Sequence, residues 1–166
     1  MHVIAADPAR VRIATRADET DLLNLCRMYH AEIGEGPFSE EKAREIMRRA
    51  FTPATNAPAI IGIAGTERIE GSICVEVATP PLSDAPFLQI VWHFVRPESR
   101  KSAYSKDLLA FAKALADPAP TGIGLKLRID TLVSRRTEAQ SKMYSRALGE
   151  PMAQAWFYDA TPAGAI

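Results

Sequence analysis

The sequence predicts one domain of the α/β or α+β class, built around a mixed sheet. Its 166 residues suit a single domain, since a chain of this length buries about 70% of its unfolded surface. The content of 47% hydrophobic and 24% charged residues is typical of a globular protein. Segments with a hydrophobic period of two residues, typical of strands, and segments with a period of three to four residues, typical of helices, follow one another in the order β-α-α-β-β-β-α-β-α-β. No internal repeat or long linker divides the chain, so we expect a domain over residues 10–160, a flexible N-terminus over 1–9 and a C-terminal tail over 161–166.

The first part of the chain predicts a short strand and two helices. Val11 and Ile13 alternate with Arg12, which suits a strand. An apolar stripe at helical spacing follows Asp18 and ends before Gly34 and Gly36; its members are Leu22, Leu25, Cys26, Tyr29 and Ile33. Ser39 is suited to cap the second helix, and its inner face would hold Ala43, Ile46, Met47 and Ala50.

The middle of the chain predicts a hairpin and then a central strand. Residues 59–65 and 68–78 read as strands joined by a short turn at residues 65–67. In the second strand one face would hold Ile69, Gly71, Ile73, Val75 and Val77, and the other Glu70, Ser72, Cys74 and Glu76. Residues 87–95 are apolar on both faces, which indicates a strand covered on both sides.

The C-terminal part of the sequence predicts two more helices and two more strands, in the order helix, strand, helix, strand. Residues 102–116 have helical spacing that stops at Asp117, and residues 135–149 form a second helical pattern that ends at Gly149 and Pro151. Residues 125–133 alternate as a strand does, and residues 152–160 read as a last strand.

Composition excludes several classes of protein. The 20 basic and 20 acidic residues balance, so we expect neither a nucleic-acid partner nor an anionic membrane. No apolar run is long enough for a membrane span, and the N-terminus has no hydrophobic signal region, so we expect a cytoplasmic protein. Cys26 and Cys74 are too few for a disulfide framework and suit the core, and no paired metal motif occurs.

One junction could bind an anion. Pro97 ends the strand over residues 87–95, and Arg100 and Lys101 follow it just before a helix. Ser102, Ala103 and Ser105 are small, so a ligand could approach the free amides of the helix start, which favour phosphate groups. The alternative is an ordinary helix start with two solvated basic side chains.

Several segments resemble the GNAT-type N-acetyltransferases. In VRPESRKSAYSKDLL, Val95, Pro97, Arg100 and the pair Leu108-Leu109 match the family's strand end, phosphate loop and helix. The opening VRIATRADETDLLNL resembles its first strand and helix, and Gly71 in RIEGSI matches a glycine common in its third strand. Tyr144 in SRRTEAQSKMYSRALG falls where the family places a tyrosine on its last main helix.

The resemblance implies a fold, a cosubstrate and a site. We expect the GNAT-like acyl-CoA N-acyltransferase fold, with a mixed, mostly antiparallel central sheet flanked by helices. Acetyl-CoA would lie where the fourth and fifth strands separate, with its pantetheine arm along Phe94 and Val95. Its pyrophosphate would meet the segment after the strand, namely Arg100, Lys101, Ser102, Ala103, Tyr104, Ser105 and Lys106. No metal is expected.

The implied reaction is direct attack of an amine on the thioester, which sets two proton tasks. Tyr144 would be the general acid, since the pKa of a phenol, about 10, suits donation to a thiolate. His93 would be the general base, with Glu76 on the neighbouring strand as the rival. The structural alternatives are a core tyrosine, a buried histidine satisfied by hydrogen bonds and an exposed carboxylate. The acceptor would be a small-molecule or protein amine, and a homodimer is left open.

The sequence departs from the family pattern at the phosphate loop. Ala103 and Ser105 replace two glycines, and Thr137 stands where an asparagine is common. The added side chains stand where pyrophosphate would lie. A non-catalytic binding or assembly module with the same fold is therefore the alternative hypothesis.

Overall fold

A computed structural model describes residues 7–33, 36–52, 59–82, 84–117, 125–130 and 137–149. Five strands form one sheet in the order β1-β2-β3-β4-β5, with β1 Val11–Ile13, β2 Ala59–Ala64, β3 Gly71–Ala78, β4 Phe87–Val95 and β5 Lys126–Ile129. The first four strands pair antiparallel, and β5 pairs parallel with β4. The mixed, mostly antiparallel sheet expected from the sequence is confirmed.

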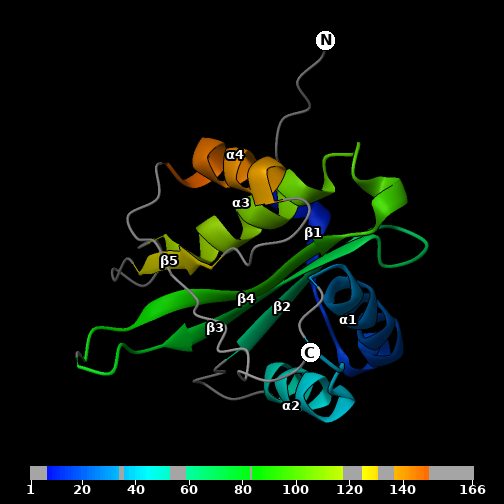
Figure 1. The fold of residues 1–166 in the computed structure, drawn as a ribbon, viewed down its shortest axis with the longest axis horizontal. Coiled ribbons are helices and arrows are strands. Elements are labelled where there is room, and N and C mark those ends of the chain that lie inside the picture. The colour runs from blue at the N-terminus through cyan, green and yellow to red at the C-terminus, as the bar shows by residue number, and fades with distance from the viewer. Residues whose placement is uncertain are drawn as a thin grey trace, which may run out of the picture.

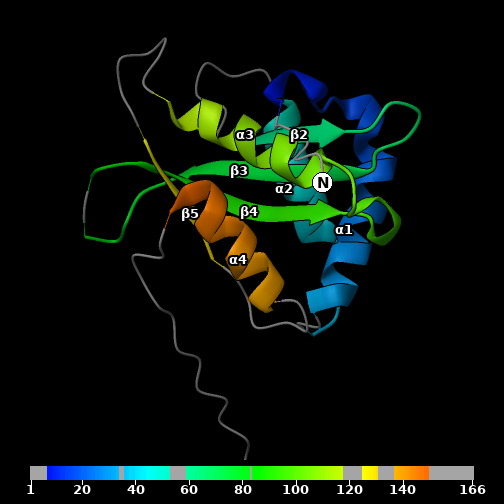
Figure 2. The same cartoon turned by 90° about the horizontal axis from the view of Figure 1, so that it is seen from above.

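Helices cover both faces of this sheet (Figure 1). Helix α1 Glu19–Ile33 and α2 Glu40–Phe51 lie on one face, while α3 Tyr104–Ala116 and α4 Thr137–Leu148 lie on the other. Seen from above, α3 and α4 lie side by side over the sheet, with α4 nearest β5 (Figure 2). The predicted order of elements is confirmed through α4; the last predicted strand, 152–160, lies outside the described residues.

Each face of the sheet has its own hydrophobic core, because successive side chains of a strand point to opposite sides. Toward α1 and α2, Leu22, Met47 and Ile61 are buried with Cys74 and Trp92, whose indole Nε1–H donates to Ser72 Oγ at 2.9 Å. The core toward α3 and α4 is formed by Ile73, Val75, Ile90, Val95, Leu108 and Leu109. The expectation that β4 is covered on both sides is confirmed.

The predicted alternation in β3 needs two corrections. The strand begins at Gly71, not Arg68, and Ile69 packs in the same core as Cys74, on the face opposite Ile73. The face that holds Glu76 is not a solvent face either, because α2 covers it and Arg49 Nη2 lies 2.7 Å from Glu76 Oε1. The hydrophobic alternation predicts this strand, but it does not show that residues 68–70 belong to the preceding turn.

The helix starts follow their capping residues. Asp18 Oδ2 accepts from the Thr15 amide at 2.8 Å, and the guanidinium of Arg12 holds the pKa of Asp18 down at about 2. Ser39 Oγ accepts from the Lys42 amide at 3.3 Å, which confirms the predicted cap of α2.

The N-terminal segment is anchored on α3. Residues Pro8–Arg10 form a 3-10 turn, and the Asp7 amide donates to the buried Asp107 Oδ1 at 2.7 Å. Residues 7–9, which the sequence assigns to the N-terminal segment 1–9, thus contact α3.

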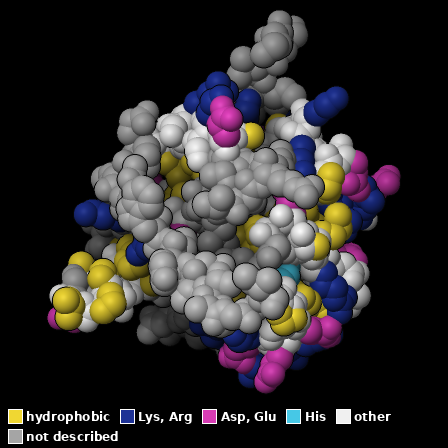
Figure 3. All heavy atoms as spheres, viewed as in Figure 1, with side chains coloured by type: hydrophobic (Ala, Val, Ile, Leu, Met, Phe, Trp, Pro, Cys, Tyr) yellow, Lys and Arg dark blue, Asp and Glu magenta, His cyan; other side chains and the backbone are white. Residues whose placement is uncertain are grey.

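The exposed faces of α1 and α2 carry side chains of both charges (Figure 3). Arg27 and Arg44 both pair with Glu40, and Arg44 also reaches Glu19. Among the described helices, none has the length and apolar character that crossing a membrane requires.

Two glycines allow α3 to lie close to the sheet. A Cβ on Gly71 would meet Val95 Cγ2 at 2.9 Å and the Phe94 carbonyl oxygen at 3.0 Å. A Cβ on Gly62 would meet ring atoms of Phe111 at 2.7 and 2.8 Å. The contacts of Gly71 include the backbone of β4, whereas those of Gly62, with Val11 Cγ1 at 2.9 Å as the third, are all with side chains, which can shift more easily than backbone.

We therefore expect Gly71→Ala to lower the free energy of unfolding by about 2 kcal/mol or more, and Gly62→Ala to lower it by less. Urea denaturation of both variants and the unchanged protein measures the difference. The reverse order would show that Phe111, not the β4 backbone, is the more rigid neighbour.

Candidate functional site

The site forms where β4 leaves β5. Val75 pairs with Ile90 and Cys74 with Trp92, so Val91 is an extra residue that bulges from β4. Strand β5 pairs only with residues 87–90 of β4, and within the described residues 91–95 have no partner on that side. The bulge also shifts the alternation, so that Ile90 and His93 face α3 and α4 while Trp92 and Phe94 face α1.

Two cavities lie along this open edge. One, of about 120 Å³, lies between the end of α1, residues 93–95 of β4, Arg100, Ser105 and α4. The other, of about 30 Å³, is lined by apolar side chains of α1 and β4 together with Asp130. His93, Gln140 and Tyr144 line both cavities.

His93 connects two hydroxyl groups from different helices. Its Nδ1 lies 3.1 Å from the Tyr144 hydroxyl of α4, and its Nε2 lies 3.2 Å from Ser105 Oγ of α3. The Ser105 hydroxyl donates to Met143 Sδ at 3.0 Å, so its oxygen accepts from Nε2–H. Nδ1 of a neutral imidazole is then the acceptor of the Tyr144 hydroxyl proton.

Burial keeps both ring systems uncharged. His93 and Tyr144 are each only 8% exposed. Desolvation lowers the pKa of His93 to about 4, against a smaller opposing effect of the Ser105 backbone, and it raises the pKa of Tyr144 well above its ordinary value. Near neutral pH the group is therefore a neutral imidazole between two neutral hydroxyls.

Arg100 closes one side of the larger cavity. Its guanidinium pairs with Glu32 at the end of α1 and lies 5.4 Å from the centroid of the Phe94 ring. Its Nε also donates to the Val95 carbonyl at 3.1 Å, so this acceptor on the open edge of β4 already has a partner.

The segment between β4 and α3 exposes backbone donors. Ser102 Oγ accepts from the Tyr104 amide at 3.2 Å, and the Ser102 amide donates to the Ser99 carbonyl at 3.1 Å. Within the described parts of the chain, the amides of Lys101, Ala103 and Ser105 have no acceptor. The amides of Ala103 and Ser105 are orphan donors of the N-terminus of α3, and the amide of Lys101 lies in the turn before it.

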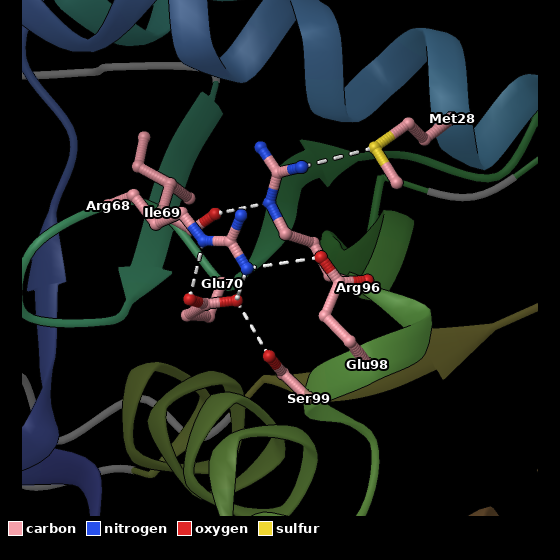
Figure 4. A network of polar contacts seen from close by, with 7 residues as sticks. All are labelled: Met28, Arg68, Ile69, Glu70, Arg96, Glu98 and Ser99. Atoms are coloured by element: carbon pink, nitrogen blue, oxygen red, sulfur yellow. Dashed lines mark hydrogen bonds and ion pairs between the residues drawn. The ribbon is translucent and has the colours of Figure 1, made fainter.

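A network of charged side chains fixes this junction from the other side (Figure 4). Arg96 Nε donates to the Ile69 carbonyl at 2.8 Å, and the Arg96 amide donates to the Glu70 carbonyl at 2.8 Å. Glu70 accepts from Arg68 at 2.7 Å and from Ser99 Oγ at 2.6 Å. These hydrogen bonds join the turn before β3 to the turn after β4.

The predicted site residues divide into three groups. His93, Tyr144, Phe94, Val95, Arg100 and Ser105 line the larger cavity together. Lys101, Ser102 and Lys106 are exposed beside it, while Ala103 and Tyr104 are buried or partly buried at the start of α3. Glu76 lies on the α2 side of the sheet, bonded to Arg49, and is not brought to His93.

Residues that the sequence did not single out for this site are Gln140 and Met143 of α4 and the pairing of Glu32 with Arg100. Gln140 and Met143 precede Tyr144 by four residues and by one residue on the same predicted helix. Their closeness to Tyr144 on that helix is the signal that could have identified them. Glu32 and Arg100 are far apart in sequence, and no local pattern joins them.

The structure is similar to many solved acetyltransferases. A probable acetyltransferase is 20% identical with a TM-score of 0.66, covering 92% of this chain and 97% of the other. AAC(6')-Iy in complex with the bisubstrate analogue CoA-S-monomethyl-acetylneamine is 16% identical with a TM-score of 0.65, covering 91% and 97%. A predicted acetyltransferase from Clostridium acetobutylicum, solved with acetyl-CoA, is 15% identical with a TM-score of 0.67, covering 89% and 93%.

The chain has the GNAT acetyltransferase fold. The resemblance drawn from the sequence is thus confirmed at the level of the fold. No protein-family model matches the chain, and no curated protein sequence matches it. Within the GNAT fold, the cavity described above lies at the separation of the fourth and fifth strands, where the resemblance implies the acetyl-CoA site.

The buried imidazole makes stability depend on pH. Because the pKa of His93 is lowered in the folded state, the unfolded chain binds a proton more readily, and stability falls as pH falls from about 6.5 toward 4. The ionisable groups facing the two cavities beside it are Tyr29, Tyr144, Glu32, Arg100 and Asp130.

We expect the unfolding free energy to fall by about 2 kcal/mol between pH 7.5 and pH 5 because of His93 alone. Urea denaturation at both pH values measures this loss in the unchanged protein, in His93→Gln and in the control His30→Gln. The loss should shrink only in His93→Gln. Equal losses in all three would contradict the depressed pKa.

Proposed function

We propose that the protein is an acetyl-CoA-dependent N-acetyltransferase that transfers the acetyl group to an amine by direct attack in a ternary complex. The observation that carries this proposal is the position of Tyr144 and His93, hydrogen-bonded at the point where β4 parts from β5. The solved proteins of the same fold that contain acetyl-CoA or a CoA-linked analogue support the cosubstrate.

The open edge of β4 suits the pantetheine arm. Residues 91–95 have no partner on β5, so amide groups of a ligand could bond there as an added strand would. The Val95 carbonyl now accepts from Arg100, and binding would require the guanidinium to release it.

The start of α3 would hold the pyrophosphate. The free amides of Lys101, Ala103 and Ser105 and the partial positive charge of the helix start favour phosphate oxygens. Arg100 would exchange Glu32 for the pyrophosphate, and Lys101 would add charge from an exposed position.

The reaction requires a neutral amine, a carbonyl within reach and a proton donor for the departing thiolate. When bound, acetyl-CoA supplies the activated acyl group. Tyr144 lines both cavities, so its hydroxyl can face the thioester sulfur from one and the acceptor from the other. It acts as the general acid, with His93 bonded behind it.

The non-catalytic module stays the second hypothesis, since one specific observation favours it. Ser105 stands at a position that is glycine in the family pattern, and its hydroxyl is held by His93 and Met143 at the edge of the cavity. Calorimetric titration with acetyl-CoA separates the two hypotheses. Micromolar affinity, about −8 kcal/mol, supports the enzyme, and no binding at millimolar ligand supports the module.

Arg100→Glu should weaken acetyl-CoA binding about tenfold or more, because it places a negative charge beside the pyrophosphate. Arg16→Glu, with the same charge change on an exposed turn away from the cavity, is the control. Glu32→Gln should not weaken binding, since it removes the present partner of Arg100. An unchanged dissociation constant for Arg100→Glu would place the pyrophosphate elsewhere.

Tyr144→Phe should lower turnover by about 100-fold or more while leaving the dissociation constant of acetyl-CoA unchanged, because only the proton donor is lost. Tyr104→Phe on α3, which keeps its backbone amide, is the matched control. Turnover is followed as thiol release across a panel of amines. Equal effects of the two substitutions would assign Tyr144 a packing role.

A further inference from the structure

We propose that Ser105, His93 and Tyr144 form an uncharged proton relay in which Ser105 is a positioning residue, so that one tyrosine serves both proton tasks of the transfer. The inference rests on the proposed function and deepens it. It starts from two hydrogen bonds, 3.1 Å from Tyr144 to Nδ1 and 3.2 Å from Ser105 to Nε2, that join two helices through one imidazole.

The relay solves a problem that the buried histidine raises. A general base must hold a proton while the reaction proceeds, but His93 is buried and its two hydrogen-bond partners among the described residues, Tyr144 and Ser105, are neutral hydroxyls that bring no charge to offset that of an imidazolium. A neutral imidazole can instead take a proton at one nitrogen while it gives one up at the other.

The polarity of the chain in the structure is set by its last member. With the Ser105 hydroxyl donating to Met143 Sδ, we assign the tautomer in which Nε2–H donates to Ser105 Oγ and the Tyr144 hydroxyl donates to Nδ1. The remaining lone pair of the Tyr144 oxygen is then free to accept a proton from the cavity.

The first half of the cycle removes the proton from the attacking nitrogen. As the C–N bond forms, that proton passes to the Tyr144 oxygen. The earlier Tyr144 proton moves to Nδ1 and the Nε2 proton moves to Ser105. The Ser105 proton turns from Met143 Sδ to a water molecule, which becomes hydronium and carries the positive charge that the attacking nitrogen has lost. The polarity of the chain is now reversed, and no residue of it carries a charge.

The second half returns a proton to the leaving group. As the C–S bond breaks, Tyr144 gives its proton to the sulfur and takes the Nδ1 proton back. Nε2 takes the proton of Ser105, and Ser105 takes one from hydronium, which returns to water. One proton has then gone from the amine to the thiol, and the chain has the polarity that the structure shows.

Variants of Ser105 test the relay because its two roles predict opposite results. If the residue only stands in the phosphate loop, Ser105→Gly restores the glycine of the family pattern, Ser105→Ala reduces the side chain, and both leave turnover unchanged or faster. If it positions His93, both lower kcat about 10- to 100-fold with the KM for acetyl-CoA unchanged. Ser105→Thr, which keeps the hydroxyl, should retain most activity.

The control is Ser39→Ala, which removes a hydroxyl from another helix start, where Ser39 Oγ accepts from the Lys42 amide of α2, away from His93. The dependence of kcat on the deuterium fraction of the solvent adds a readout that a structural role would not move. A plot of kcat against the deuterium fraction should curve for the unchanged protein, since several protons move in one step. The plot should become closer to linear for Ser105→Ala.

Three outcomes would overturn the relay. They are full turnover of Ser105→Ala, a loss that appears only in the KM for acetyl-CoA, and a loss in Ser105→Thr equal to that in Ser105→Ala. Nitrogen NMR of the His93 ring tests the chain without catalysis: we expect Nε2 protonated and Nδ1 bare at neutral pH, with the Nε2 proton losing its protection from exchange in Ser105→Ala. A protein that binds no acetyl-CoA and turns over no amine yet shows this ring state would refute the proposed function and leave the hydrogen-bonded chain in place.

Discussion

The architecture depends on β4, which pairs antiparallel with β3 on one side and parallel with β5 on the other. Among the described residues, β4 pairs with β3 on both sides of the bulge at Val91, but its pairing with β5 stops at Ile90. Because a single inserted residue turns every later side chain to the other face, His93 points to α3 and α4 while Phe94 points to α1. The same irregularity thus opens the edge of the strand and aims the imidazole at it.

Burial then decides the chemistry that this arrangement can perform. The charged groups of the site, Arg100 and Glu32, lie at its partly exposed rim, where solvent and each other stabilise them. His93 and Tyr144 lie behind them and stay neutral over the range in which an acetyltransferase would work. In the proposed function, the partly exposed rim of the cavity would therefore bind the anion and its buried wall would transfer the proton.

Periodicity predicted the helices, the strand order along the chain and the two-sided burial of β4, since these depend on spacing that is visible locally. It could not predict the bulge, because residues 87–95 are apolar almost throughout and an inserted Val91 breaks no visible alternation. Nor could it predict the partners of the site. His93 and Ser105 were singled out for separate roles, and only the path of the chain from β4 into α3 brings their side chains together.

The missing glycines of the phosphate segment have a specific physical meaning. Ala103 has φ −78 and ψ −12, and no described residue other than glycine has a positive φ, so this turn does not require glycine's backbone freedom. What glycine would add is space, and here Ala103 is buried while the Ser105 hydroxyl is turned toward His93. The amides stay available, and the Ser105 side chain joins the proposed phosphate segment to the proposed proton relay through its bond to His93. A ligand that shifts the first turn of α3 must also shift the hydrogen bond that orients the imidazole.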